Sequence, residues 1–304
     1  MAPAAQSPLP VVVRLLGTGG PRVDPRRCGP ATLVSIGDEH LLFDAGRGVA
    51  VQLARAGIAL GRLRDVFVTH HHFDHIGDLY DVMLSSWFEG RRETLTIHGP
   101  PETRRIVDAL QGQIYDKDIE WRSDGEPVFG GWAPVLGRDV APGLVAETPR
   151  WRVHADTVVH GHGLGFSPAF LKRWICYGYR VESQGVVVAI SGDTVDCAGL
   201  RRLALGADVL VQCCYLAAAE IEGEHLRRLA AHTLACGDTV GRIAAECGVK
   251  TLVLTHHRPR RDDTALARLH DEVRRDFVGT LMLAQDLDVV DLNLGSGLAF
   301  CPQD

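Results

Sequence analysis

The stretch VTHHHFDHIGD, Val68 to Asp78, holds four histidines and two aspartates within eleven residues. The apolar segment DVFVT, residues 65–69, runs directly into it and is typical of a short buried strand. Burying so many imidazoles and carboxylates costs free energy unless they are paired or hold a metal ion. The cluster therefore predicts a metal site at the end of a strand, rather than a solvated polar loop.

Four residues of this cluster form the pattern H-x-H-x-D-H: His70, His72, Asp74 and His75. Residues two apart at a strand end point the same way, so His70 and His72 can hold one ion. After the chain turns, Asp74 and His75 can face a second ion, whereas His71 points away. Imidazole and carboxylate ligands suit Zn²⁺, with Mn²⁺ or Fe as alternatives.

The composition is that of an ordinary globular protein, with 304 residues of which 46% are hydrophobic and 23% charged. The net charge is −6, and Lys and Arg are scattered rather than gathered in a basic stripe. No apolar run approaches the ~20 residues that span a bilayer. The start MAPAAQSPLP lacks a secretory pattern, and the eight cysteines form no C-x-x-C pair. We therefore expect a cytoplasmic protein with reduced thiols and no membrane segment.

Short strands followed by helices occur in both halves of the chain, which suits two packed sheets with helices outside, or an ordinary doubly wound fold. The patterns predict strands over 11–16, 31–36, 39–43, 65–69, 95–99, 151–160, 174–182, 185–191, 207–213, 249–257 and 288–294. They predict helices over 48–57, 79–88, 101–112, 237–248 and 262–277. Residues 112–150 mix Gly, Pro and charge, and we expect an insertion of strands and loops that shapes a pocket mouth.

The H-x-H-x-D-H pattern after a buried strand resembles the metallo-β-lactamase superfamily. Three further segments agree with that family in order: LLFDAG (41–46), ISGDT (190–194) and LVLTHH (252–257). The motifs GTGG, YGYRVE and SGDT most resemble its ribonuclease Z and arylsulfatase-like branch. The resemblance implies an α/β fold, an αββα four-layer sandwich of two mixed sheets with helices outside. It implies one domain over 1–304, with 1–10 expected to be disordered.

The resemblance also implies a set of metal ligands. A further histidine should come from TVVHGHG, where His160 ends an apolar strand and is preferred, with His162 as the alternative. The implied site has one ion on His70, His72 and His160, a second ion on Asp74, His75 and His256, and Asp193 bridging both. Two Zn²⁺ ions are expected, about 3.5–4 Å apart, sharing an activated hydroxide. Asp44 either holds a ligand imidazole or forms a turn before Gly46.

Two residues are candidates for direct catalytic roles. Asp74 can orient the hydroxide, and the resemblance to ribonuclease Z places His232 where it can protonate the leaving group. The alternative for His232 is a surface residue beside a helix. Trp87, Phe88 and Tyr215 are candidates for the pocket wall, with core packing as the alternative.

These observations favour a metal-dependent hydrolase acting on a small activated substrate: a phosphodiester, a sulfate ester or a lactone. A tRNA 3′-processing endonuclease of the ribonuclease Z type is ranked below it, because residues 76–150 offer only EGRRE and ETRRI as basic features. An iron-dependent redox enzyme is disfavoured, because diiron members of the family carry glutamate where this chain has His72. A non-catalytic binding protein is the remaining class, and a homodimer is expected from resemblance alone.

Overall fold

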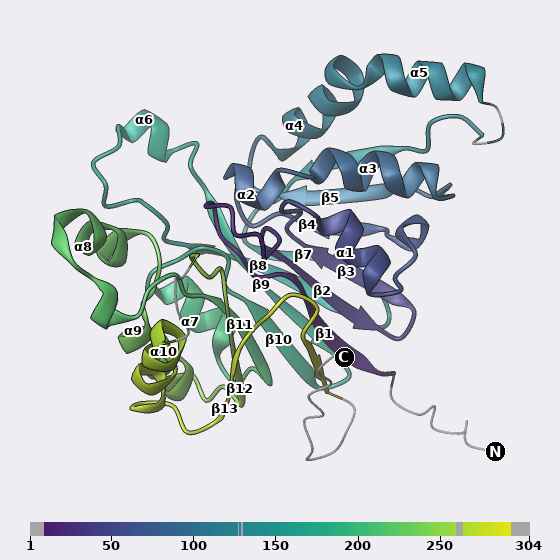
Figure 1. Cartoon of the computed structure of the whole chain (residues 1–304). Helices are drawn as coiled ribbons and strands as arrows, with labels where there is room; N and C mark the ends of the chain where they lie inside the picture. Colours follow the sequence, from purple (N-terminus) through teal and green to yellow (C-terminus); the bar gives the residue numbers. More distant parts are fainter. Residues whose placement is uncertain (1–8, 127, 129, 260–263, 293–304) are drawn as a thin grey trace, which may run out of the picture.

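The computed structural model describes residues 9–126, 128, 130–259 and 264–292, and its first sheet has seven strands in the order β14-β1-β2-β3-β4-β5-β6 (Figure 1). The pairs from β14 through β3 are antiparallel, and those from β3 to β6 are parallel. The strands are β1 Val11–Gly17, β2 Ala31–Ile36, β3 Glu39–Phe43, β4 Asp65–Phe67, β5 Leu95–Gly99, β6 Val135–Asp139 and β14 Val289–Asp291.

The second sheet also has seven strands, in the order β13-β12-β11-β10-β9-β8-β7. Its pairs from β7 to β10 are antiparallel, and those from β10 to β13 are parallel. The strands are β7 Gly143–Glu147, β8 Arg152–Val158, β9 Cys176–Ser183, β10 Val186–Ile190, β11 Val209–Cys213, β12 Thr251–Thr255 and β13 Thr280–Leu283. Both sheets are therefore mixed, as predicted.

Helices cover the outer face of each sheet (Figure 1). Apolar side chains of α1, α3 and α4 pack on the first sheet, and those of α7, α9 and α10 pack on the second. A third apolar cluster, which includes Phe43, Phe67 and Tyr179, lies between the sheets. This confirms the αββα sandwich. The helices are α1 Val49–Arg55, α2 Phe73–Ile76, α3 Leu79–Phe88, α4 Thr103–Ala109, α5 Asp116–Gly125, α6 Pro168–Leu171, α7 Ala198–Ala204, α8 Gly223–His232, α9 Gly237–Glu246 and α10 Thr264–Arg274, with 3₁₀ turns at Leu60–Arg62 and Ala218–Glu220.

The carboxyl ends of five strands position the candidate ligands. β3, β4, β10 and β12 belong to the parallel parts of the two sheets, and β8 runs in the same direction as β10. The residues that follow these five strands include Asp44, His70, His160, Asp193 and His256. Because the carboxyl ends of such strands meet at one edge, residues far apart in the chain converge there.

Segment 112–150 differs from the expected strands and loops. A π-helical turn at Leu110–Ile114 leads into α5, which buries none of its side chains and so has no apolar periodicity to reveal it. β6 and β7 then form the edge strands of the two sheets. Residues 1–8, which cover most of the expected disordered start, lie outside the described residues. None of the described helices is long and apolar enough to cross a membrane.

Candidate metal centre

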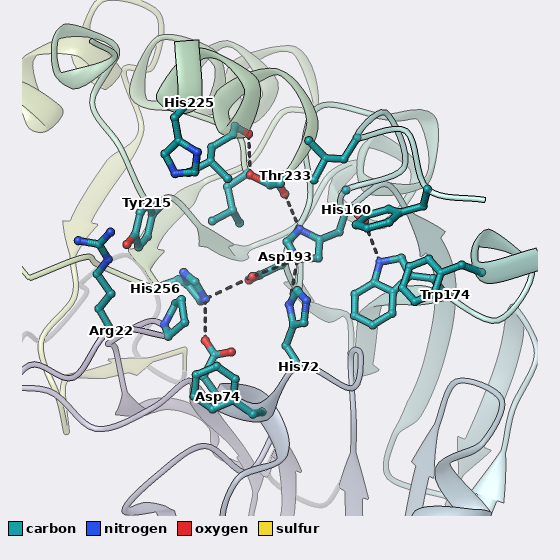
Figure 2. A pocket seen from close by; sticks show the side chains of 18 residues that line it. Arg22, His72, Asp74, His160, Trp174, Asp193, Tyr215, His225, Thr233 and His256 are labelled. Carbon is teal, nitrogen blue, oxygen red and sulfur yellow. Dashed lines mark hydrogen bonds and ion pairs between the residues drawn. The ribbon is translucent and has the colours of Figure 1, made fainter. Parts of the chain in front are cut away.

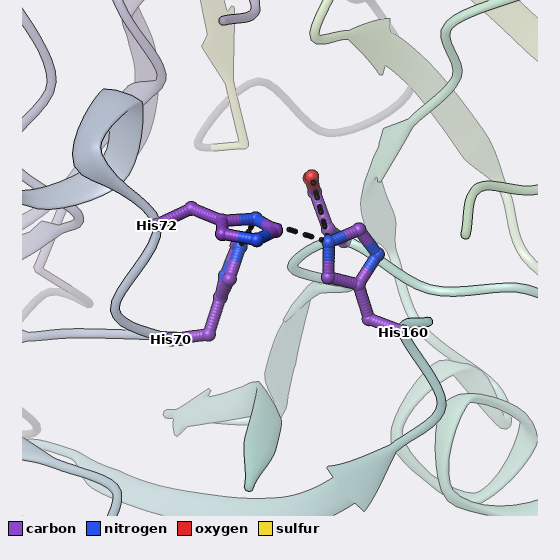
Figure 3. A group of neighbouring side chains, drawn as sticks. His70, His72 and His160 are labelled. Carbon is purple, nitrogen blue, oxygen red and sulfur yellow. Dashed lines mark hydrogen bonds and ion pairs between the residues drawn. The ribbon is translucent and has the colours of Figure 1, made fainter. Parts of the chain in front are cut away.

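Three histidines and one aspartate form the first group of ligand atoms: His70, His72, His160 and Asp193 all lie within 4.8 Å of one another. The Nε2 atom of His70 lies 3.0 Å from Nδ1 of His72, and Nε2 of His160 lies 3.2 Å from that same atom (Figure 3). Oδ2 of Asp193 lies 3.8 Å from Nε2 of His160. The three imidazole nitrogens thus surround one point.

The hydrogen bonds on the far sides of these rings fix their tautomers. The Thr69 hydroxyl donates to Asp44 at 2.9 Å, so it accepts from Nδ1 of His70 at 3.0 Å. Nδ1 of His160 donates to the Thr233 carbonyl at 2.7 Å. Both Nε2 atoms therefore turn lone pairs toward His72.

A proton on Nδ1 of His72 can satisfy only one of those two lone pairs, whereas a cation among the three nitrogens satisfies all of them. Burial lowers the pKa of His70 well below its ordinary value. Burial, assisted by the neighbouring His160, lowers the pKa of His72 to about 4. Neutral imidazole is the form that binds metal, so this group fits an ion.

The second group contains Asp74, His75 and His256, again within 4.8 Å. Nε2 of His256 lies 3.4 Å from Oδ2 of Asp74 and 3.3 Å from Oδ2 of Asp193 (Figure 2). Nε2 of His75 lies 3.4 Å from Oδ1 of Asp193, so this carboxylate faces both groups.

Several buried side-chain atoms make no hydrogen bond within the part of the chain that the structure describes, and four of them belong to this group and to the shared aspartate: Asp74 Oδ2, His75 Nε2, Asp193 Oδ1 and His256 Nε2. Unpaired buried polar atoms are rare in native proteins and need an explanation. These four converge on one spot, and their donor types are those that Zn²⁺ accepts. The residues present therefore fit a second ion.

Asp44 holds the ring of His75. Its Oδ2 accepts from Nδ1 of His75 at 2.7 Å, and its Oδ1 accepts from the Thr69 backbone N–H at 2.8 Å. Burial alone would lower the pKa of His75, but the carboxylates of Asp193 and Asp44 outweigh it and hold the pKa well above its ordinary value. Asp44 has a φ of 60°, a left-handed conformation that costs free energy outside glycine. Of its two expected roles, the structure shows that of holding the imidazole.

The GTGG segment forms a tight turn against the site. Gly19 bridges to His257, the neighbour of His256. A Cβ atom on Gly20 would lie 2.9 Å from Cε1 of His256, closer than side chains pack. Glycine is thus required here for close approach to a ring of the second group.

A cavity of about 600 Å³ opens over both groups (Figure 2). Its floor includes His72, Asp74, His160, Asp193 and His256. One wall of the cavity is apolar. The cavity is also lined by Arg22, Tyr215 and His225. None of the described residues of 112–150, which we expected to shape the mouth, lines this cavity, because their strands lie at the far sheet edges.

The histidine alternatives separate clearly. His160 belongs to the first group, whereas Nδ1 of His162 accepts from the His160 backbone N–H at 3.1 Å and His162 lies in neither group. His232 does not line the cavity, contrary to its expected catalytic place. It ends α8, and its ring lies against Gly163. The cavity-lining histidine of α8 is His225, about two helical turns earlier in the same helix.

Other site residues were harder to foresee. Trp87 is fully buried in the core, Phe88 is exposed, and Tyr215 lines the cavity. Trp174 also lines the cavity, although the sequence pattern predicts it as the first residue of a strand over 174–182 and gives it no site role. The repeated spacing of Phe166, Phe170 and Trp174, four residues apart, was the available signal.

The model of the Metallo-beta-lactamase superfamily matches residues 27–196, more than half of the chain. The chain belongs to the metallo-beta-lactamase superfamily. Curated relatives support this over a longer span. A protein named Ribonuclease Z from Mycolicibacterium paratuberculosis (strain ATCC BAA-968 / K-10) is 33% identical over 94% of this chain and 100% of its own length. One of the same name from Mycobacterium avium (strain 104) shows the same values.

Solved structures of superfamily members share the fold. The metallo-beta-lactamase fold protein YhfI from Bacillus subtilis superposes with a TM-score of 0.70 at 20% identity, over 93% of this chain and 99% of its own. The short form of human tRNase Z superposes with a TM-score of 0.64 at 21% identity, over 92% and 98%. At these identities the likeness establishes the architecture.

The expected partner of this superfamily member needs correction. We ranked a small-molecule substrate above nucleic acid, and that ranking was wrong, because the curated relatives are ribonucleases by name. The net charge of −6 gives no sign of a local group of arginines beside the site. Arg26, Arg27, Arg47 and Arg55 line a cleft of about 470 Å³ together with Asp24 and Asp286, and Arg26 is ion-paired with Asp24. The Arg47 guanidinium lies 5.8 Å from the ring of Phe73, which lines the main cavity, so cleft and cavity adjoin.

Proposed function

We propose that this superfamily member is an endonuclease of the ribonuclease Z type, which hydrolyses a phosphodiester at the 3′ end of precursor tRNA. The observation that carries the proposal is the 33% identity to proteins named Ribonuclease Z over 94% of this chain and all of theirs. The proposal is also supported by the two adjoining groups of candidate metal ligands, which lie at the base of an open cavity.

His70, His72 and His160 would hold one cation, and Asp74, His75 and His256 a second, with Asp193 shared between them. Zn²⁺ is the proposed ion, since imidazole and carboxylate donors suit it, with Mn²⁺ and Fe as alternatives. Two such ions, when bound, supply positive charge that polarises a phosphoryl oxygen and lowers the pKa of water. A homodimer stays a prediction.

The protein side chains supply orientation and proton transfer. Asp74 lines the cavity, and its carboxylate can orient the attacking water and accept its proton. His225 lines the same cavity from α8 and can donate a proton to the leaving oxygen. We therefore assign to His225 the role that the sequence suggested for His232.

The arginines beside the cavity would position the RNA backbone. Arg55 is exposed, Arg26 is exposed but ion-paired with Asp24, and Arg47 is half-buried between the cleft and the cavity. Guanidinium groups form bidentate hydrogen bonds with phosphate oxygens, and these contacts do not depend on base sequence. Such contacts would fix the register of the RNA and make binding sensitive to salt.

The direct test is cleavage of a precursor tRNA that carries a 3′ extension, by protein loaded with Zn²⁺ or Mn²⁺. Wild type should release the extension, Asp74→Ala should not, and His154→Ala should match wild type, because His154 lies in neither ligand group. No cleavage by protein with bound metal would refute the proposal and favour a binding protein. Bound iron with a redox-active optical spectrum would favour the oxidoreductase.

A further inference from the structure

An aromatic ladder, Phe166, Phe170 and Trp174, runs from solvent to the metal centre. The ring centroids of Phe166 and Phe170 are 4.7 Å apart, and those of Phe170 and Trp174 are 5.6 Å apart at an interplanar angle of 15°. Trp174 then meets His72 at 4.7 Å. All three ladder residues line the cavity.

The outer part of this ladder has no evident structural purpose. Phe166 is 43% exposed and Phe170 is 37% exposed, although burial of an aromatic ring is worth a large gain in free energy. Trp174 differs, because its indole N–H donates to the His160 carbonyl at 2.9 Å and so helps to place a ligand. Exposed rings at the mouth of a site indicate a flat, apolar ligand surface.

Two cations lie near the ladder, and a third faces it across the cavity. Arg22 lines the cavity on the side opposite Trp174 (Figure 2). Lys172 is exposed on the ladder segment itself, and the Arg228 guanidinium reaches the Leu164 carbonyl at 3.3 Å. Aromatic faces flanked by basic side chains are the combination that binds single-stranded nucleic acid, with bases stacked and phosphates neutralised.

We propose that the aromatic ladder stacks the unpaired bases beside the scissile phosphate, so that the site selects a single-stranded extension. Bases within a duplex already stack on each other and cannot offer their faces to side chains. A strand whose phosphate reaches the ligands near His72 brings the adjoining base to Trp174 and the next to Phe170. This inference rests on the proposed function, because it names the substrate feature which that site recognises.

Phe170 is the residue to change, because the hydrogen bonds that the structure gives it are made by its backbone N–H and carbonyl, which a substitution keeps. The measurement is fluorescence anisotropy of a labelled single-stranded oligoribonucleotide with metal-free protein, which separates binding from catalysis. Phe170→Ala and Phe170→Leu should weaken binding by about 5- to 100-fold, the effect of one lost stack. Phe170→Tyr should keep it. Phe88→Leu changes an exposed phenylalanine that does not line the cavity, and is the matched control.

A second arm uses an oligonucleotide of the same length without bases. It should bind wild type at least as weakly as the normal strand binds Phe170→Ala, because it loses every stack on the ladder rather than one. Four results would each overturn the proposal that the ladder stacks bases. They are equal binding of the two strands by wild type, unchanged binding by Phe170→Ala, full binding by Phe170→Leu, and no binding by wild type. Near-ultraviolet circular dichroism of each variant verifies folding.

The two proposals fail differently. If wild type leaves precursor tRNA intact but its single-strand affinity depends on Phe170, the ladder stands and the proposed function falls. If wild type processes precursor tRNA while Phe170→Ala binds and cleaves equally well, the ladder falls and the proposed function stands.

Discussion

Asp44 accepts a hydrogen bond from Nδ1 of His75 at 2.7 Å and thereby sets the orientation of a ring whose Nε2 faces the second ligand group. Such outer contacts tune metal affinity. Asp44→Asn keeps the shape but weakens this acceptor, so we expect affinity for the second ion to fall by about 10- to 100-fold. Competition with a chromogenic chelator measures it. Unchanged affinity would show that His75 is held by its packing alone.

His160 and His162 make a matched pair of variants two residues apart. Because only His160 belongs to the first ligand group, His160→Ala should lose one ion per chain, whereas His162→Ala should keep both. Elemental analysis after gel filtration gives the ratio of metal to protein. The reverse result would assign the ligand to His162 and refute the geometry described above.

Gly20 leaves room for the ring of His256. Adding a methyl group would bring Cβ to 2.9 Å from that ring, so Gly20→Ala should displace it and reduce both metal retention and cleavage. Gly112→Ala is the control, since its Cβ would meet nothing within 4 Å. Calorimetric titration with Zn²⁺ compares them, and equal affinities would argue against close approach at Gly20.

The carboxylate of Glu102 ties the segment that carries the ladder to the start of α4. Hydrogen bonds from Arg173, and then from Arg105, lower the pKa of Glu102 to about 2 from 4.5. A depressed pKa means that the contribution is present above 4.5 and is lost as pH falls toward about 2. Glu102→Gln should therefore speed amide exchange in residues 168–174 at neutral pH.

The difference between wild type and Glu102→Gln should persist down to pH 4.5 and shrink below it. High salt should also reduce it, because the pair is partly exposed and therefore screened. Hydrogen exchange read by mass spectrometry makes this comparison. No difference at neutral pH, or a difference already lost at pH 4.5, would show that the pair does not hold the segment.

The arginine cleft should contribute to RNA affinity through phosphate contacts. Arg47→Ala and Arg55→Ala should each weaken binding of precursor tRNA uniformly across sequences and lower the salt slope by about 1. Arg242→Ala, an exposed arginine of α9, should leave the slope unchanged. Filter binding at several salt concentrations gives the slopes. Equal slopes in all variants would remove the cleft from the binding surface.

Much of the fold was predictable because its buried elements carry strong periodicity. The expected helix over 79–88 coincides with α3, and the buried strands before His70 and His256 lie where predicted. Helices α5 and α8 were missed. Neither buries a side chain, and the sequence of α5 also lacks an apolar stripe, whereas α8 is amphipathic but lies outside the core. Tertiary support, rather than local pattern, accounts for them.

The site residues were likewise predictable only in part. Candidate ligands such as Asp74 and Asp193 stand in motifs with fixed order, so the sequence located them. His225, Arg22 and Arg47 reach the cavity or its neighbouring cleft only through the folding of distant loops and helices. The choice of substrate went wrong for this reason: net charge is a sum over the chain, whereas RNA meets a local surface.

The number of ions that the folded chain holds tests the central claim most directly. Native mass spectrometry of protein loaded with Zn²⁺ and then freed of excess metal should give two ions per chain for wild type. The shared carboxylate predicts that Asp193→Ala retains fewer than two. Wild type with one ion or none, or an Asp193→Ala variant with two ions held as tightly, would contradict the paired-cation site.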